Sequence, residues 1–405
     1  MLIKNKSSLV VIALLVMASC SQFVKQAWLA SGFNPEVYAG WATAVLASQL
    51  LFNFGGLGFH NFASRHAAIY ESRGKRLLTN RLVAKQLLIY TYILPLSIPV
   101  IYFLIAKPAP ELFTIMLFYS VVNVFLNSAT NPIYVRSSLE FAKIQSIRGV
   151  VGAAVAVVTC YFTGSLLLTL ISESLLILVL GIMTLKSQNF KWRKKYFKLD
   201  WNYKVLLPFF LPVLLATVSL SLSRIIAIDL LNDEFLGTYY FIFIVASFGF
   251  IFQYGLSVFF GPIITSRLST SSTGYLNTFI LRCWIILVIF SLLVGLAGSV
   301  FLPFLVSFLY PSYSAGLILI IPMLFLAMAK ICDIWSIYFL LGGFEKFLYI
   351  PHLCSIILAI LIYIFVVDVD NFKFIDMRFF IFGEALATFF IPLLLFLIMN
   401  IRWSR

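Results

Sequence analysis

The sequence predicts an all-α polytopic membrane protein with about twelve transmembrane helices, arranged as two duplicated six-helix lobes. Hydrophobic residues make up 62% of the 405 residues, charged residues only 11%, and the mean hydropathy is +1.03. A single water-soluble core of this length needs far fewer apolar residues. The apolar runs are continuous and do not alternate as barrel strands do, so they predict helices.

Short polar breaks divide the chain into twelve spans, each about 20 residues long, enough to cross about 30 Å of hydrocarbon. We place the spans at residues 8–30, 39–60, 83–105, 112–133, 147–163, 166–185, 205–230, 238–262, 279–308, 314–341, 347–367 and 379–400. The longest polar segment is basic and lies in the middle of the chain. We therefore expect an N-terminal lobe at 1–186, a cytoplasmic linker at 187–204 and a C-terminal lobe at 205–405.

Positive charge falls into every second break. Twenty-two Lys and Arg residues lie on one side, in the breaks or, for Lys85 and Arg148, within the first three residues of a span, against only Lys107, Lys373 and Arg378 on the other. The positive-inside rule therefore predicts that both termini are cytoplasmic. The net charge of +14 is spread over the inner loops, where anionic headgroups lie, so we expect membrane lipids and no nucleic acid as partners.

The two halves of the chain repeat one another. Asn34-Pro35-Glu36 leads into the second span as Asn232-Asp233-Glu234 leads into the eighth, and these spans close with Ser64-Arg65 and Ser266-Arg267. Ser172-Glu173 in the sixth span recurs as Gly383-Glu384 in the twelfth. A duplication with six spans per copy gives both copies the same orientation, with an axis along the membrane normal and a cavity between them.

Two stretches carry a resemblance to a known family. They are Phe33-Asn34-Pro35-Glu36-Val37-Tyr38-Ala39-Gly40-Trp41 and Gly55-Gly56-Leu57-Gly58-Phe59-His60-Asn61-Phe62-Ala63-Ser64-Arg65. Together they resemble the first hairpin of polysaccharide-biosynthesis flippases, the O-antigen (Wzx-type) branch of the multidrug/oligosaccharidyl-lipid/polysaccharide (MOP) exporter superfamily. The local likeness covers the hairpins of spans 1–2 and 7–8, whereas span count and duplication extend it to the whole chain.

The resemblance implies a MATE/MOP-like fold and a transporter function without enzymatic activity. A flippase of this type moves an undecaprenyl-pyrophosphate-linked oligosaccharide from the inner to the outer leaflet of the bacterial inner membrane by alternating access. The implied partners are this glycan, membrane lipids, and the polysaccharide polymerase and chain-length machinery. Coupling to a proton or sodium gradient is expected, and no cofactor or metal is expected, because the five Cys and three His have no ligand spacing.

Charged residues inside spans are candidates for binding a pyrophosphate, because an ionised side chain at such depth costs several kcal/mol unless it is paired or hydrated. Lys25 in span 1 and Arg224 in span 7 lie at matching depth, and Lys330 in span 10 is followed by Asp333. Two interpretations stay open for the last two residues, because their i, i+3 spacing also suits mutual neutralisation.

Two further pairs match between the lobes. Glu173 and Glu384 suit either a coupling proton or cation, or hydrogen bonds to neighbouring helices. Arg65 and Arg267 lie at the inner ends of their spans, where either incoming phosphate or ordinary membrane topology explains them.

Two other functions remain alternatives. A drug or cation antiporter of the same superfamily shares the fold, but it usually places a carboxylate where this chain has Lys25 and Arg224. A membrane-embedded polysaccharide polymerase generally presents a large outer loop, whereas the outer breaks here are about ten residues or fewer, a length that suits plain connections between helices.

Overall fold

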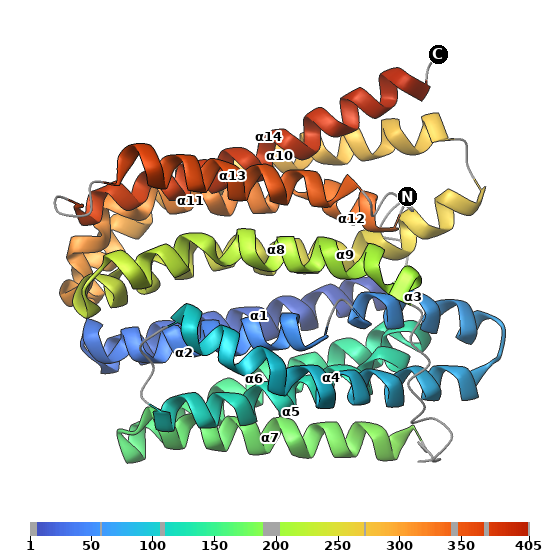
Figure 1. The fold of residues 1–405 in the computed structure, drawn as a ribbon, viewed down its shortest axis with the longest axis horizontal. Coiled ribbons are helices and arrows are strands. Elements are labelled where there is room, and N and C mark those ends of the chain that lie inside the picture. The colour runs from blue at the N-terminus through green and yellow to red at the C-terminus, as the bar shows by residue number, and fades with distance from the viewer. Residues whose placement is uncertain are drawn as a thin grey trace. The chain divides into compact units, whose positions relative to one another are not determined.

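A computed structural model of the protein describes residues 6–56, 59–105, 110–188, 203–270, 273–341, 347–367 and 372–403. These residues form helices joined by short connections (Figure 1). Residues 189–202, most of the expected linker, lie outside the described residues.

The chain divides into two compact units, called the N-lobe and the C-lobe. The N-lobe comprises Met1–Leu29 and Gly40–Leu214, and the C-lobe comprises Ala30–Ala39 and Leu215–Arg405. In the N-lobe the helices are α1 (Lys6–Gly32), α2 (Pro35–Gly56), α3 (Phe59–Ser72), α4 (Arg76–Ile105), α5 (Pro110–Arg136), α6 (Ser138–Thr163) and α7 (Leu166–Ser187). Helix α8 (Tyr203–Leu230) continues into the C-lobe, followed by α9 (Asp233–Thr270), α10 (Thr273–Leu309), η2 (Pro311–Gly316), α11 (Leu317–Ile331), α12 (Ile334–Leu341), α13 (Tyr349–Val366), η4 (Phe374–Asp376) and α14 (Met377–Trp403).

Ten segments among the described residues are long and apolar enough to cross a membrane. They are Arg76–Tyr102, Phe113–Ile133, Ser138–Thr163, Leu166–Ser187, Phe210–Leu230, Asp233–Gln253, Leu276–Leu309, Pro311–Phe339, Tyr349–Val366 and Phe374–Met399. Each overlaps one of the last ten spans expected from the sequence, and helices α1 and α2 cover most of the first two. The prediction of an all-helical polytopic membrane protein is therefore confirmed.

The helices of each lobe repeat one packing pattern. In the N-lobe, α5 packs against α4, α6 and α7, and α6 also packs against α7. In the C-lobe, α11 packs against the corresponding helices α10 and α14, and α13 packs against α14. The third and fourth, fourth and sixth, and fifth and sixth spans therefore make the same contacts in each lobe, as a duplicated chain requires.

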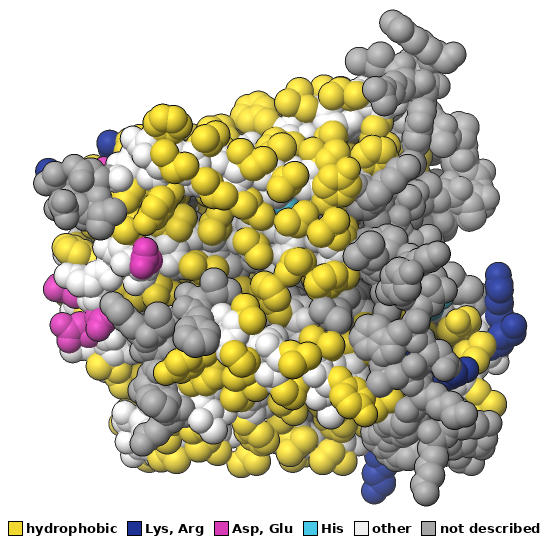
Figure 2. Space-filling view, viewed as in Figure 1, with side chains coloured by type: hydrophobic (Ala, Val, Ile, Leu, Met, Phe, Trp, Pro, Cys, Tyr) yellow, Lys and Arg dark blue, Asp and Glu magenta, His cyan; other side chains and the backbone are white. Residues whose placement is uncertain are grey.

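The exterior in view is predominantly apolar along the helices. Figure 2 shows hydrophobic side chains over most of the described surface, with charged side chains near the helix ends. Large residues such as Phe162 and Phe365 are 79% and 81% exposed. A surface of this kind is stable against acyl chains, which is consistent with lipid-facing helices.

The turn between α6 and α7 is specified by local chemistry. The Ser137 hydroxyl accepts the Glu140 N–H (3.2 Å) at the start of α6, and Gly164 ends this helix in the left-handed region at φ 61°. Ser165 then caps α7 by accepting the Leu168 N–H (3.3 Å). Glycine adopts a left-handed φ without a Cβ clash, and serine supplies the missing acceptor for free helix N–H groups. The tight hairpin fixes the register of α6 against α7.

One expected span differs from the observed helices. Span 10 is expected from the sequence as one helix and is instead divided into α11 and α12. The break has a clear cause, because the Asp333 side chain caps α12, as described below. The expected end of span 2 at residue 60 follows residues 57–58, which lie outside the described residues.

Candidate functional site

A buried ion pair joins the first and last spans of the N-lobe. The Lys25 ammonium of α1 donates to both carboxylate oxygens of Glu173 in α7, at 2.8 and 3.0 Å. The two side chains are 3% and 4% exposed. Taking both charges out of water costs several kcal/mol per ion, which their attraction offsets only because the geometry is good. From the sequence, Lys25 is a candidate substrate ligand and Glu173 suits either coupling or hydrogen bonding, but no spacing rule links the two residues.

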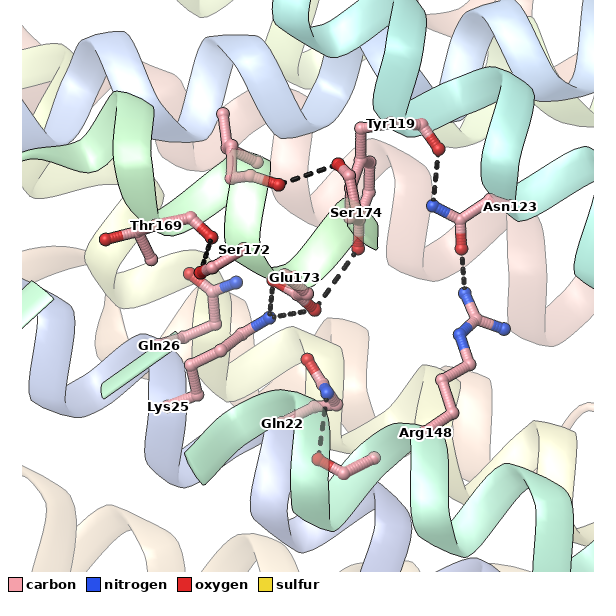
Figure 3. Close-up of polar contacts among 12 residues, drawn as sticks. Gln22, Lys25, Gln26, Tyr119, Asn123, Arg148, Thr169, Ser172, Glu173 and Ser174 are labelled. Atoms are coloured by element: carbon pink, nitrogen blue, oxygen red, sulfur yellow. Dashed lines mark hydrogen bonds and ion pairs between the residues drawn. The ribbon is translucent and has the colours of Figure 1, made fainter. Parts of the chain in front are cut away.

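Further polar side chains surround this ion pair (Figure 3). The Tyr119 hydroxyl of α5 donates to Glu173 Oε1 at 3.4 Å. On α1, the Gln22 side chain donates to the Gly149 carbonyl of α6 (3.1 Å). The cluster therefore draws on α1, α5, α6 and α7, and a shift of one of these helices changes the contacts of the others.

A second cation belongs to the same cluster. Arg148 donates from Nη2 to the side-chain oxygen of Asn123 on α5 and from Nη1 to the Gln145 side chain (3.4 Å), and Figure 3 shows the first of these contacts. In the sequence, Arg148 was grouped with the inner breaks. In the structure it lies ten residues after Ser138, the start of α6, which is about 15 Å along the helix.

The C-lobe holds a comparable pair made from other helices. Lys330 near the end of α11 lies 3.7 Å from Glu384 Oε1 of α14, and the side chains are 2% and 5% exposed. Lys330 also donates to the Thr388 hydroxyl (3.2 Å) and lies 5.0 Å from the centre of the Phe250 ring. In each lobe a buried lysine thus meets the glutamate of the last helix.

Asp333 caps the start of α12 and does not pair with the neighbouring Lys330. Its carboxylate accepts the Ser336 N–H (3.1 Å) and the Ser336 hydroxyl (2.8 Å), the contacts of an N-terminal cap on α12. It also accepts the Gln253 side chain of α9. Of the two interpretations left open for Lys330 and Asp333, mutual neutralisation is not the arrangement found, because the partner of Lys330 is Glu384.

Arg224 of α8 lies beside an aromatic ring. Its Nη2 donates to the Leu220 carbonyl (3.1 Å) and the Ser221 hydroxyl (3.3 Å), and the guanidinium carbon lies 4.8 Å from the centre of the Phe243 ring. The preceding residue, Ser223, donates to Glu384 Oε2 at 2.9 Å. Arg224 and Lys330 therefore come from helices that both meet Glu384.

A small cavity adjoins Glu384 between α8, α13 and α14. Its free volume is about 10 Å³, roughly the space of one water molecule, and Ser219, Ser223 and Ser355 line it together with Glu384. Ser219 also forms a hydrogen bond with His352 Nδ1 at 2.9 Å. The C-lobe carboxylate is thus placed where a water molecule can reach it.

One end of the N-lobe carries an ion pair at the surface. Arg136, the last residue of α5, donates twice to Glu71 of α3, at 2.8 Å each. These hydrogen bonds lower the pKa of the Glu71 carboxyl below its usual value. The side chains of Arg65 and Arg267, expected at the inner mouths, lie outside the described residues.

The described residues contain no group of three or more His, Cys, Asp or Glu side chains placed to hold a metal ion. The polar clusters consist instead of Lys, Arg, Glu and amide side chains. Such groups bind anions and transfer protons.

Known structures share the fold, although neither a protein-family model nor a curated protein sequence matches the chain. One similar structure is described as an inward-facing conformation of a multidrug resistance MATE family transporter of the MOP superfamily. It matches at a TM-score of 0.67 and 16% identity, over 98% of this chain and 98% of that chain. The outward-facing conformation of such a transporter matches at 0.65 and 16%, over 100% and 97%.

A third structure, of a MATE protein in the straight conformation, matches at a TM-score of 0.62 and 17% identity, over 100% of this chain and 97% of that chain. At these identities the likeness establishes the fold. The chain is a multi-pass helical membrane protein with the fold of these MATE transporters, which confirms the predicted fold class.

Proposed function

We propose that this chain, having the MATE fold, is a flippase for an undecaprenyl-pyrophosphate-linked oligosaccharide in the bacterial inner membrane. It moves an O-antigen unit or a similar surface polysaccharide repeat from the inner to the outer leaflet by alternating access. Inward-facing and outward-facing structures of the same fold support the alternating-access part of the proposal. Both termini are cytoplasmic in this proposal, and polymerase and chain-length proteins receive the product.

One observation carries the choice of an anionic substrate. Each lobe buries a lysine among its helices, Lys25 at 3% exposure and Lys330 at 2%, and Arg224 and Arg148 add two more cations. Charged residues within spans are costly and are a functional hypothesis by default. A pyrophosphate brought off the membrane surface needs cations of this kind, because an unpaired anion in hydrocarbon costs far more.

The residues take distinct roles in this proposal. Lys25, Arg224 and Lys330 bind the pyrophosphate, while Asp333 holds the end of α11 that carries Lys330. Glu173 and Glu384 compete for the lysines and carry the coupling proton. Arg65 and Arg267 receive phosphate at the inner side.

The test is transfer in vesicles. In proteoliposomes loaded with a fluorescent polyprenyl-pyrophosphate-linked sugar, Lys25→Ala and Arg224→Ala each abolish flipping, whereas expression and membrane insertion persist. Lys143→Ala is the matched control, because Lys143 lies exposed near the start of α6. Wild-type transfer by both Lys25→Ala and Arg224→Ala contradicts their assignment as substrate ligands.

An antiporter of drugs or cations is the second candidate, because the similar solved structures are described as multidrug resistance transporters. Glu173 and Glu384 are acids that a cation can bind, although each already has a lysine partner. The two functions differ in substrate charge. Uptake of a cationic dye against a proton or sodium gradient, without transfer of the anionic lipid, favours the antiporter and rules out the flippase.

A further inference from the structure

The N-lobe ion pair has the geometry of a phosphate site that is already filled. The Glu173 carboxylate presents two oxygens to one ammonium, at 2.8 and 3.0 Å, and takes a third contact from Tyr119 at 3.4 Å. A phosphate group likewise presents charged oxygens that accept hydrogen bonds from an ammonium at these lengths. Lys25 is therefore held by an internal anion of the kind that the substrate supplies.

The charge balance of the cluster favours an incoming anion. Lys25 and Glu173 neutralise each other, whereas the described contacts of Arg148 run to amide oxygens of Asn123 and Gln145. One positive charge therefore remains in excess.

Lys25 has the means to change partner. Its four-carbon stem has several rotatable bonds, in contrast to the planar fork of an arginine. Helix α6 presents Gly152 to the carboxylate, where a Cβ would lie 3.8 Å from Glu173 Oε1 and 3.9 Å from Gln22. The side of the ion pair toward α6 is thus bounded by a residue without a side chain.

We propose that Glu173 acts as an internal substitute for the substrate phosphate: the incoming anion takes Lys25 from Glu173, and Glu173 takes up a proton from the aqueous phase in exchange. This inference rests on the proposed function and adds a coupling step to it. Its ligand is an anionic phosphate ester, and its stoichiometry is one proton for each anion bound in the N-lobe.

The reason for the proton is electrostatic. Once Lys25 has turned to the phosphate, Glu173 is a buried carboxylate without its counter-ion, and such a group neutralises instead of staying charged. The charged and titratable groups near it are Lys25 from α1, Tyr119 from α5 and, beyond Tyr119, Arg148 from α6. Of these, only Lys25 contacts the carboxylate as a cation, so its departure decides the protonation of Glu173.

The exchange also works in reverse. Linkage requires that loss of the proton from Glu173 weakens anion binding by the same factor as anion binding favours protonation. Release of the anion, loss of the proton from Glu173 and return of Lys25 to Glu173 therefore occur together.

The experiment measures affinity against pH. The probe is farnesyl-pyrophosphoryl-N-acetylglucosamine, whose phosphates stay fully ionised between about pH 5.5 and 8.5, and the sample is the full chain in nanodiscs. For wild type we expect Kd to rise about tenfold per pH unit in the upper part of this range, as uptake of one proton demands. For Glu173→Gln, which retains hydrogen bonding without the charge, we expect Kd to be independent of pH and at least about tenfold lower at pH 8.

The control is the same substitution at an exposed site of the same lobe. Glu140 lies exposed in the first turn of α6, so Glu140→Gln keeps the wild-type slope. A second measurement needs no variant: calorimetry in buffers of different ionisation enthalpy gives the protons taken up per anion, near one at pH 8 in our proposal.

Two outcomes overturn the exchange while leaving the flippase intact: probe binding by wild type without proton uptake, or an unchanged pH slope in Glu173→Gln. Either of two other outcomes contradicts the proposed function itself: wild type does not bind the probe, or wild type and Lys25→Ala bind it equally well.

Discussion

At the scale of the residue, Lys25 and Glu173 show why a membrane protein keeps a buried ion pair. A pair of well-packed apolar residues is often as stable as a buried ion pair or more stable, so stability alone does not explain the two charges. What the charges supply is a cation within the helices that can be exchanged between two anions. The 2.8 and 3.0 Å contacts hold that cation in place until an anion arrives.

A double-mutant cycle separates stability from function at this pair. Lys25→Met and Glu173→Leu each leave one buried charge without its partner, and we expect each to lower the free energy of unfolding by about 3–5 kcal/mol. The double variant removes both charges and should return to within about 1 kcal/mol of wild type. Denaturation of the purified protein in detergent measures the three values, and transport by the double variant should remain absent.

The matched controls for this cycle lie on the exposed part of α6. Lys143→Met and Glu140→Leu change surface side chains, so each should alter stability by less than about 0.5 kcal/mol. Additive losses in the Lys25/Glu173 double variant, with no coupling energy, contradict an ion pair at this position.

The buried charged residues could be singled out from the sequence, but their partners could not. Lys25 and Glu173 stand out because each is charged within an apolar span, yet 148 positions separate them and no spacing rule links them. For Lys330, the i, i+3 spacing suggested Asp333 as a partner. The structure instead pairs Lys330 with Glu384, which is distant in sequence. Arg148 was missed because a charge near the end of an apolar run looks the same whether it lies in a loop or inside a helix.

At the scale of the element, α1 and α6 approach so closely that one position of α6 excludes any side chain. A Cβ at Gly149 would lie 2.7 Å from the Cα, Cβ and carbonyl oxygen of Ala18. Small residues at such contacts let helix backbones meet in a membrane. The contact lies beside both Arg148 and Gln22, so it sets the distance between the two sides of the cluster.

Two glycines of α6 give a matched pair of substitutions. Gly149→Ala forces the backbones apart, and we expect a loss of about 1–3 kcal/mol in unfolding free energy together with weaker anion binding. Gly152→Ala places its Cβ in ordinary contact, 3.8 Å from the nearest atom, so its stability should stay within about 0.5 kcal/mol of wild type. Thermal unfolding of both variants checks this, and equal losses would falsify the close approach of α1 to α6.

The helices themselves were largely predictable, whereas their ends were not. Hydropathy reports the apolar centre of a span, but α4 runs for 30 residues, about 45 Å, and passes beyond about 30 Å of hydrocarbon. Arg76 and Arg81 precede the expected span at 83–105 and yet lie within α4. The break between α11 and α12 was not predicted, because it depends on a single side chain within an apolar run. The Asp333 carboxylate caps the N-terminus of the following helix, α12.

At the scale of the whole molecule, the repeat in sequence has a counterpart in packing. Three pairs of corresponding spans make the same contacts in each lobe, and each lobe pairs a buried lysine with the glutamate of its last helix. The lysines themselves do not correspond, because Lys25 lies in the first span of its lobe and Lys330 in the fourth. The repeated hydropathy pattern therefore predicts the fold, whereas the position of the buried lysine differs between the two lobes.

Orientation in the membrane gives the last prediction. The excess of Lys and Arg in alternate breaks places Arg73, in the turn after α3, inside and Lys373, before η4, outside. Both side chains are exposed, so in a variant lacking the five native cysteines a single Cys at either position should be reactive. We expect a membrane-impermeant maleimide on intact cells to label Lys373→Cys and to label Arg73→Cys only after permeabilisation. Labelling of Arg73→Cys in intact cells reverses the orientation, and with it the direction of phosphate entry on which the proposed flipping depends.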